Sequence, residues 1–167
     1  KKRWTGCHQV IGNIAENWHV PRLYDPVYGQ NQASLYMMGG RNEKNWLWFE
    51  YLGAPHMIYS TVPHEVVRFD WSFEMREVYK TGYSNPLWTY GLQRGGTPPV
   101  LVNSEYWSFF HSSVPWIGWK RRYHMAAYAF EAKPPFRITR MSSMPILTGS
   151  RNDPWAEGLP LVVFPCG

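Results

Sequence analysis

The sequence has few charged residues and no long apolar run. Only 17% of its 167 residues are Asp, Glu, Lys or Arg, and the net charge is +5. The basic residues occur in scattered pairs, such as Arg121–Arg122, rather than in long runs. The sequence has neither the clustered basic residues nor a recognisable binding module of a nucleic-acid-binding protein. We therefore expect no nucleic-acid partner. No apolar run approaches the roughly 18 residues of a membrane-spanning helix, so we expect no membrane partner either.

Cysteine is also scarce, and its two copies, Cys7 and Cys166, lie at opposite ends of the chain. Two cysteines do not make the disulfide framework of a small secreted domain. Their redox state stays open, and the cytoplasm is the compartment that we favour. The six histidines show neither His-Glu-x-x-His nor His-x-His spacing. We therefore expect no metal site and no cofactor.

Aromatic residues, in contrast, are abundant. They make up 17% of the chain and include ten Trp, and the sequence also has 14 Gly and 14 Pro. Bulky aromatics together with many Gly and Pro and few helix formers are typical of an all-β protein. The length suffices for one domain with a real core. The composition therefore predicts an all-β domain.

Three segments repeat one pattern: an alternating strand, an acidic corner and a second alternating strand. The corners fall at Glu16, Asp70 and Glu131, and we expect Asp70 and Glu131 to be structural. Before each of the last two corners comes a short apolar strand, a turn and a second apolar strand that ends in small hydroxyl residues. Four strands that recur at about 50 to 60 residues indicate the antiparallel blades of a β-propeller. A β-sandwich is the alternative, but it has no reason to repeat this pattern.

The repeat predicts one partial propeller domain over residues 1–167. Residues 1–25 would form the outer half of a blade, residues 43–82 and 92–147 two whole blades, and residues 159–167 the start of another. An incomplete ring leaves strand edges and apolar faces uncovered. We therefore expect either a longer protein that supplies the missing blades at both ends or a homo-oligomer.

The stretch LQRGGTPPVLV leads into the second whole blade. In a propeller the first strand of each blade lines the central channel, and ligands bind at the channel mouth. Gly95 and Gly96 would let the backbone approach a ligand without Cβ clashes, while Arg94 and His111 would face the mouth. The alternative interpretation is a tight turn between blades.

Four stretches of the chain resemble glycoside hydrolase family 130: EKNWLWFE…MIYSTVPHEV, LQRGGTPPVLV…YWSFFHSS, YHMAAYAFEAKPPFRITRMSSMPIL and VVFPCG. The resemblance covers nearly all of the chain from Glu43 onward. It is closest to the branch that carries the Lys-Asn-Trp and Arg-Gly-Gly-Thr-Pro elements. The family consists of five-bladed propellers, mostly β-mannoside phosphorylases with some hydrolases, so this chain would represent about three of five blades. The implied substrate is a β-linked mannooligosaccharide, with inorganic phosphate as a possible co-substrate.

The resemblance also implies a binding site. Lys44 and Asn45 fall where the family has an Arg-Asn pair that contacts phosphate and sugar, and His111 falls on a phosphate-site histidine. Arg94 takes the part of a lysine in the same loop, at a different spacing. A second phosphate arginine of the family is missing at or near Ser60, which is a departure from the pattern of phosphorolysis.

Glycoside cleavage needs a general acid besides the nucleophile. The family's catalytic aspartate would lie in a blade before this chain, so we expect the chain alone to be inactive. Within it Glu50 is the best candidate acid, although a solvated turn residue is the alternative. Aromatic faces suit pyranose rings, so the candidates for stacking on sugar are Trp46, Trp48, Trp107, Trp116 and Trp119. We expect most of them in the core between blades and only one or two in the site, and Trp46 and Tyr123 are the aromatic residues that we assign to it.

Two other functions fit the same sequence. One is a propeller that binds carbohydrate without catalysis, and the other is a propeller used for protein contacts. Phosphorolysis, hydrolysis and binding alone therefore stay open, as do the sugar and its linkage.

Overall fold

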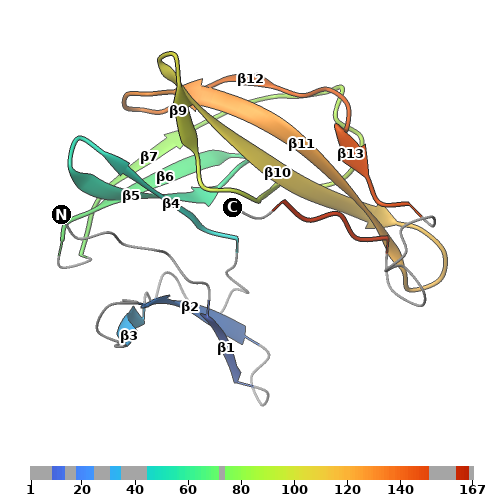
Figure 1. Cartoon of the computed structure of the whole chain (residues 1–167), viewed down its shortest axis with the longest axis horizontal. Coiled ribbons are helices and arrows are strands. Elements are labelled where there is room, and N and C mark those ends of the chain that lie inside the picture. The colour runs from blue at the N-terminus through green and yellow to red at the C-terminus, as the bar shows by residue number, and fades with distance from the viewer. Residues whose placement is uncertain are drawn as a thin grey trace. The chain divides into compact units, whose positions relative to one another are not determined.

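The computed structural model describes the backbone of residues 9–13, 18–24 and 31–34, and both backbone and side chains of residues 45–71, 74–150 and 161–165. Every regular element in these ranges is a β-strand, and all named strands pair antiparallel (Figure 1). The prediction of an all-β fold is therefore confirmed. In these same ranges there is no helix that could cross a membrane.

The chain divides into two compact units, Lys1–Asn45 and Trp46–Gly167. The first unit contains a three-stranded sheet of β1 (Gln9–Asn13), β2 (Trp18–Tyr24) and β3 (Asn31–Ser34), in that order. The corner predicted at Glu16 lies outside the described residues.

The second unit begins with a four-stranded sheet whose strands follow one another in chain order. They are β4 (Leu47–Tyr51), β5 (Ala54–Ser60), β6 (His64–Phe69) and β7 (Met75–Thr81). Leu52 and Gly53 join β4 to β5 with φ values of 48° and 74°. Positive φ at both central residues of a two-residue turn matches the right-handed twist of the strands. The result is a tight meander of four antiparallel strands.

The second sheet of this unit is built on two long central strands, β10 (Glu105–Pro115) and β11 (Arg121–Glu131). Each flanking position is occupied by two short strands in succession. They are β8 (Arg94–Gly95) and β9 (Val100–Val102) along β10, and β12 (Ile138–Met141) and β13 (Leu147–Thr148) along β11. The six strands therefore form one sheet with four strand positions in a meander. Each of the two edge positions is divided between two short strands.

The interruption between β8 and β9 has a local cause. Pro98 and Pro99 have no backbone N–H and cannot donate to the ladder. Two hydrogen bonds of Thr97 replace part of the hydrogen-bond ladder. Its N–H donates to the carbonyl of Phe109 at 3.2 Å, and its Oγ1 accepts the N–H of Phe109 at 3.0 Å. The edge strand thus stays attached to β10 through a side chain.

The core lies between the two sheets. Phe49 of β4 packs its ring edge-on against Tyr106 and Phe130 of the second sheet, with centroids 5.0 Å and 6.0 Å apart. Phe136, from the corner between β11 and β12, lies 5.8 Å from Phe49 and 5.3 Å from Tyr51. Face-to-face packing of antiparallel sheets occurs both in β-sandwiches and between adjacent propeller blades. Antiparallel sheets are thus established, and the propeller arrangement stays a proposal.

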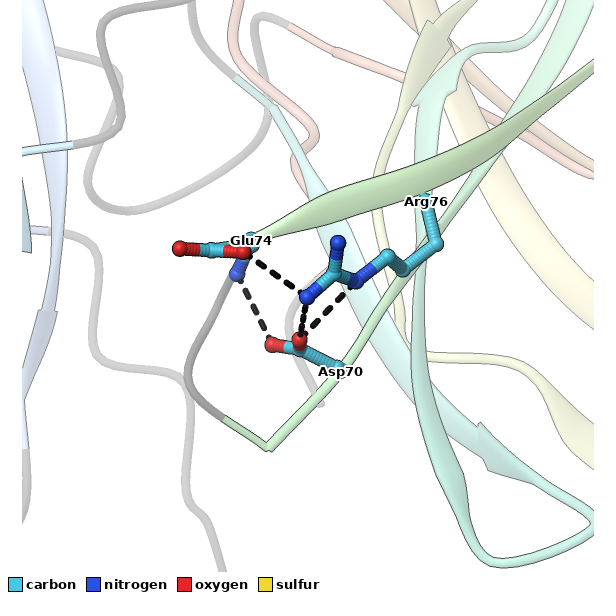
Figure 2. Close-up of polar contacts among 3 residues, drawn as sticks. All are labelled: Asp70, Glu74 and Arg76. Atoms are coloured by element: carbon cyan, nitrogen blue, oxygen red, sulfur yellow. Dashed lines mark hydrogen bonds and ion pairs between the residues drawn. The ribbon is translucent and has the colours of Figure 1, made fainter.

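Asp70 closes the corner between β6 and β7 (Figure 2). Its Oδ1 accepts the backbone N–H of Glu74 at 3.0 Å, and its Oδ2 accepts Nε of Arg76 at 2.9 Å. Arg76 also pairs with the Glu74 carboxylate at 2.7 Å. The acid therefore ties the two strands together at their shared end.

Glu131 does the same work at the corner between β11 and β12. Its N–H donates to the carbonyl of Arg137 at 2.9 Å, its carboxylate accepts the Arg137 N–H at 3.4 Å, and the two side chains pair at 3.7 Å. In both corners the arginine follows the acid at the sixth position, as in Asp70 and Arg76. This spacing agrees with the structural role predicted for the repeated acids.

Candidate functional site

Arg94 and His111 are direct partners across strands β8 and β10. Directly opposed residues of an antiparallel pair project from the same face of the sheet. Tyr123 of β11 is on that face too, since it lies two residues from Met125, the partner of His111. The rings of His111 and Tyr123 are nearly parallel, with an interplanar angle of 18° and centroids 6.3 Å apart. Three of the predicted site residues are therefore brought together.

His111 is only 3% exposed, and an aromatic ring covers it. Phe164 lies with its ring centroid 4.1 Å from the imidazole. The segment that carries Phe164 is attached to β11, because the N–H of Tyr123 donates to the carbonyl of Leu161 at 3.0 Å. Segment 161–165 thus forms one wall of the site.

Arg94 supplies positive charge beside this histidine. Its side chain is half-buried, and none of the carboxylates that the structure describes lies within 4 Å of its guanidinium. Guanidinium donors match the oxygens of phosphate and carboxylate in a planar fork. Arg94 can therefore hold an anion, whereas the ring of His111 on the same face is enclosed by Phe164.

Position 96 has no room for a side chain, and the reason is a contact within the chain rather than a ligand. A Cβ at Gly96 would collide with Cγ of Pro165 and would lie 2.8 Å from the carbonyl oxygen of Phe109. The close approach is therefore made by the chain itself, at the same wall of the site. The expectation that this glycine makes room for a ligand is corrected by this contact.

Glu50 is not brought to the Arg94–His111 pair. It follows Phe49 on β4, and successive side chains of a strand point to opposite faces. Phe49 faces the second sheet, so the exposed Glu50 points away from it. Arg94 and His111 also lie on the face of their sheet that is turned away from this core, since their neighbour Phe110 is in it. The candidate acid and the candidate anion site thus project in opposite directions.

Three other predicted residues are consecutive in the chain, where the first unit ends and the second begins: Lys44, Asn45 and Trp46. Trp46 is 1% exposed and packs 5.7 Å from Tyr59, so its ring is in the core. Asn45 is partly exposed, with a φ of 67°, and Lys44 lies outside the described residues. Convergence of Lys44 and Asn45 with Arg94 stays a prediction. Ser60, at the position of the missing arginine, donates its hydroxyl to the carbonyl of Pro63.

The sequence did not reveal a group of buried polar side chains between the sheets. His64 is fully buried, and its ring lies 5.9 Å from that of Tyr128. Burial lowers the pKa of His64 to about 4 and raises the pKa of the Tyr128 hydroxyl, which the hydroxyls of Ser108 and Thr61 partly offset. The signal in the sequence is Val66, which lies two residues from His64 on β6 and is buried on the same face.

Within the part of the chain that the structure describes, no three His, Cys, Asp or Glu side chains are grouped as metal ligands would be. Comparison with protein-family models, with curated proteins and with solved structures found no match to this chain.

Proposed function

We propose that the chain contributes blades to a β-propeller that acts on β-linked mannooligosaccharides by phosphorolysis or hydrolysis. The observation that carries the proposal is the pairing of Arg94 with His111 on one sheet face, with Tyr123 stacked alongside. The resemblance to glycoside hydrolase family 130 assigns the positions of Arg94 and His111 to phosphate binding.

The chemistry follows from the side-chain types. Arg94 would donate two hydrogen bonds to phosphate or to a sugar oxygen, and His111 would donate a third where Phe164 leaves its ring open to the ligand. Phosphate held there would be positioned as the nucleophile, and water would take its place in hydrolysis. Asn45 and Lys44 would add further donors from the neighbouring blade. The general acid would be the family's aspartate in another blade, since Glu50 points away from this pair.

The test is incubation of the full-length protein with β-1,4-mannobiose, with and without inorganic phosphate. Mannose 1-phosphate formed only with phosphate would demonstrate phosphorolysis, and free mannose in both reactions would demonstrate hydrolysis. Arg94→Ala should lower kcat/KM by about 100-fold, the loss typical of a donor to a reacting anion. Arg140→Ala is the matched control, because Arg140 pairs with Glu105 at 2.8 Å on the sheet surface, and it should leave the rate unchanged. Absence of both products would overturn the enzymatic function.

Carbohydrate binding without catalysis is a second candidate, and the orientation of Glu50 favours it. Calorimetric titration with β-1,4-mannohexaose separates the two. Binding that Arg94→Ala weakens, with no product formed, would assign the chain to this class.

A further inference from the structure

The turn that joins β10 to β11 exposes large apolar side chains. Trp116, Ile117 and Trp119 are 45%, 57% and 78% exposed, at the end of the longest hairpin in Figure 1. The turn is internally bonded, because the N–H of Trp116 donates to the carbonyl of Lys120 at 2.9 Å and the N–H of Lys120 donates to that of Ile117 at 3.2 Å. We call residues 116–122 the hairpin tip. It presents a pre-formed aromatic surface.

The tip also carries positive charge that no carboxylate among the described residues neutralises. Lys120, Arg121 and Arg122 follow one another, and no Asp or Glu occurs between Glu105 and Glu131. None of the three is within 4 Å of a described carboxylate. The two arginines are held by neutral groups instead.

Arg121 donates to Oγ and to the carbonyl oxygen of Ser113, at 2.9 Å and 2.8 Å. Arg122 lies with its guanidinium carbon 4.8 Å from the centre of the Trp116 ring and donates to the carbonyl of Gly149 at 3.2 Å. These contacts orient the two arginines, and none of them involves a carboxylate among the residues that the structure describes.

The tip continues the candidate site along the same strands. Ser113, which holds Arg121, is two residues beyond His111 on β10 and opposite Tyr123 on β11, so all four side chains share one face. About 13 Å of strand separates His111 from Pro115 at the rise of an extended chain. A sugar chain that lies along this face from Arg94 would therefore reach Arg121 at the tip. Arg122, opposite Val114 on β10, projects from the other face, where its guanidinium lies over the ring of Trp116.

We propose that the hairpin tip binds the acidic sugar units of a β-linked anionic polysaccharide. Trp116 and Trp119 would stack on the pyranose rings. Arg121, on the face of the candidate site, and Lys120 at the turn would pair with carboxylates of the chain. The inference rests on the proposed action on β-linked sugars and adds to it that the preferred substrate is charged.

The test compares two polymers with the same β-1,4-linked backbone, mannan and poly-mannuronate, which differ in the carboxylate at C6. Calorimetric titration of the full-length protein with hexamers of each should give about tenfold tighter binding of the mannuronate, equivalent to about 1.4 kcal/mol. The difference should shrink as salt is raised from 50 to 500 mM, because salt screens exposed charges.

Two variants locate the effect. Trp119→Ala and Lys120→Gln should each weaken mannuronate binding by about three- to tenfold. The matched controls are Trp71→Ala, which removes a half-exposed tryptophan from the corner after β6, and Lys133→Gln, which removes an exposed lysine from the corner after β11. Both controls should bind like the unaltered protein.

Equal affinity for the two hexamers, or tight mannuronate binding that survives Trp119→Ala, would overturn the inference even if mannobiose is cleaved. Mannuronate binding at the tip without action on any mannoside would contradict the proposed function and leave the inference about the tip standing. A third arm uses vesicles of phosphatidylcholine with and without phosphatidylserine. Binding to the anionic vesicles and to neither hexamer would assign the tip to a membrane surface and also overturn the inference.

Discussion

His64 is an ionisable side chain enclosed by aromatic rings, with the ring of Phe130 5.0 Å away. Burial lowers its pKa from 6.5 to about 4. Between these two values the unfolded chain binds a proton that the folded chain does not, so the free energy of unfolding falls as the pH falls through this window. The contribution of His64 to the free energy of unfolding reaches its full value above about pH 6.5. His56 and His124, whose pKa values burial also lowers, act in the same direction.

We therefore predict that His64→Leu reduces the pH dependence of stability. Between pH 7 and pH 5, protonation of His64 in the unfolded chain should lower the free energy of unfolding by about 2 kcal/mol. Urea denaturation at pH 7.5, 6 and 5 measures it. The variant should show a flatter profile, whereas Ile58→Leu, a core change without a titrating group, should keep the original slope. An unaltered slope in His64→Leu would contradict the assignment.

Gly96 gives a second test at this scale. Gly96→Ala should lower the free energy of unfolding by about 1–3 kcal/mol, the usual cost of overpacking, because the new Cβ would meet Pro165 and the carbonyl of Phe109. Gly82→Ala is the control, since no heavy atom lies within 4 Å of its Cβ position. Thermal unfolding of both variants distinguishes a packed glycine from a merely flexible one. If both changes are neutral, Pro165 does not lie against Gly96.

Strand β10 separates two environments at neighbouring positions. Phe110 is completely buried between the sheets, whereas Phe109 is 40% exposed on the outer face. We predict that Phe110→Ala lowers the free energy of unfolding by about 3–5 kcal/mol and that Phe109→Ala lowers it by less than half as much. Urea denaturation of the pair measures the difference. Similar losses for both would mean that the outer face is covered as fully as the core.

The corner between β6 and β7 tests the repeated acid. Asp70→Ala removes the acceptor of the Glu74 N–H and should lower the free energy of unfolding by about 1 kcal/mol. Asp70→Asn keeps an oxygen at that position and should lose less. Thermal unfolding compares the two. Equal losses would mean that the ion pair with Arg76, rather than the backbone hydrogen bond, holds the corner.

In the described part of the second unit, a second apolar surface is exposed besides the hairpin tip. Val100, Val102 and Phe109 all project from the outer face of the β8–β13 sheet and are exposed. They lie toward the β9 end of that face, away from the basic tip. Monomeric proteins rarely expose large contiguous apolar patches, so we expect a further sheet or a second copy of the chain to cover this one.

We predict that the 167-residue chain self-associates at micromolar concentration. Sedimentation velocity should show a mass that rises with concentration, and Val100→Lys should shift it toward the monomer. Leu87→Lys changes an exposed leucine outside the strands and should not. A monomer at every concentration would contradict this prediction and would show that the apolar face is stable when exposed to solvent.

Local features of the sequence predicted the elements of this fold. Aromatic and β-branched alternation indicated the strands, and the recurring acids marked the corners that Asp70 and Glu131 close. The segment 43–82 was predicted as four strands, and β4 to β7 occupy it. These signals are local because a strand alternates over a few residues and a corner is closed by neighbours in sequence.

The placement of side chains in the candidate site was decided by tertiary structure. The register of β8 on β10 brings Arg94 opposite His111, and strand alternation against the core turns Glu50 away. Packing against Pro165 explains Gly96, and packing between sheets buries His64 and Trp46. Such outcomes depend on which face meets another sheet, and residues far apart in the chain determine that. The sequence by itself thus determined strands, corners and an all-β class, whereas only the pairing and packing of those strands decided which polar groups meet.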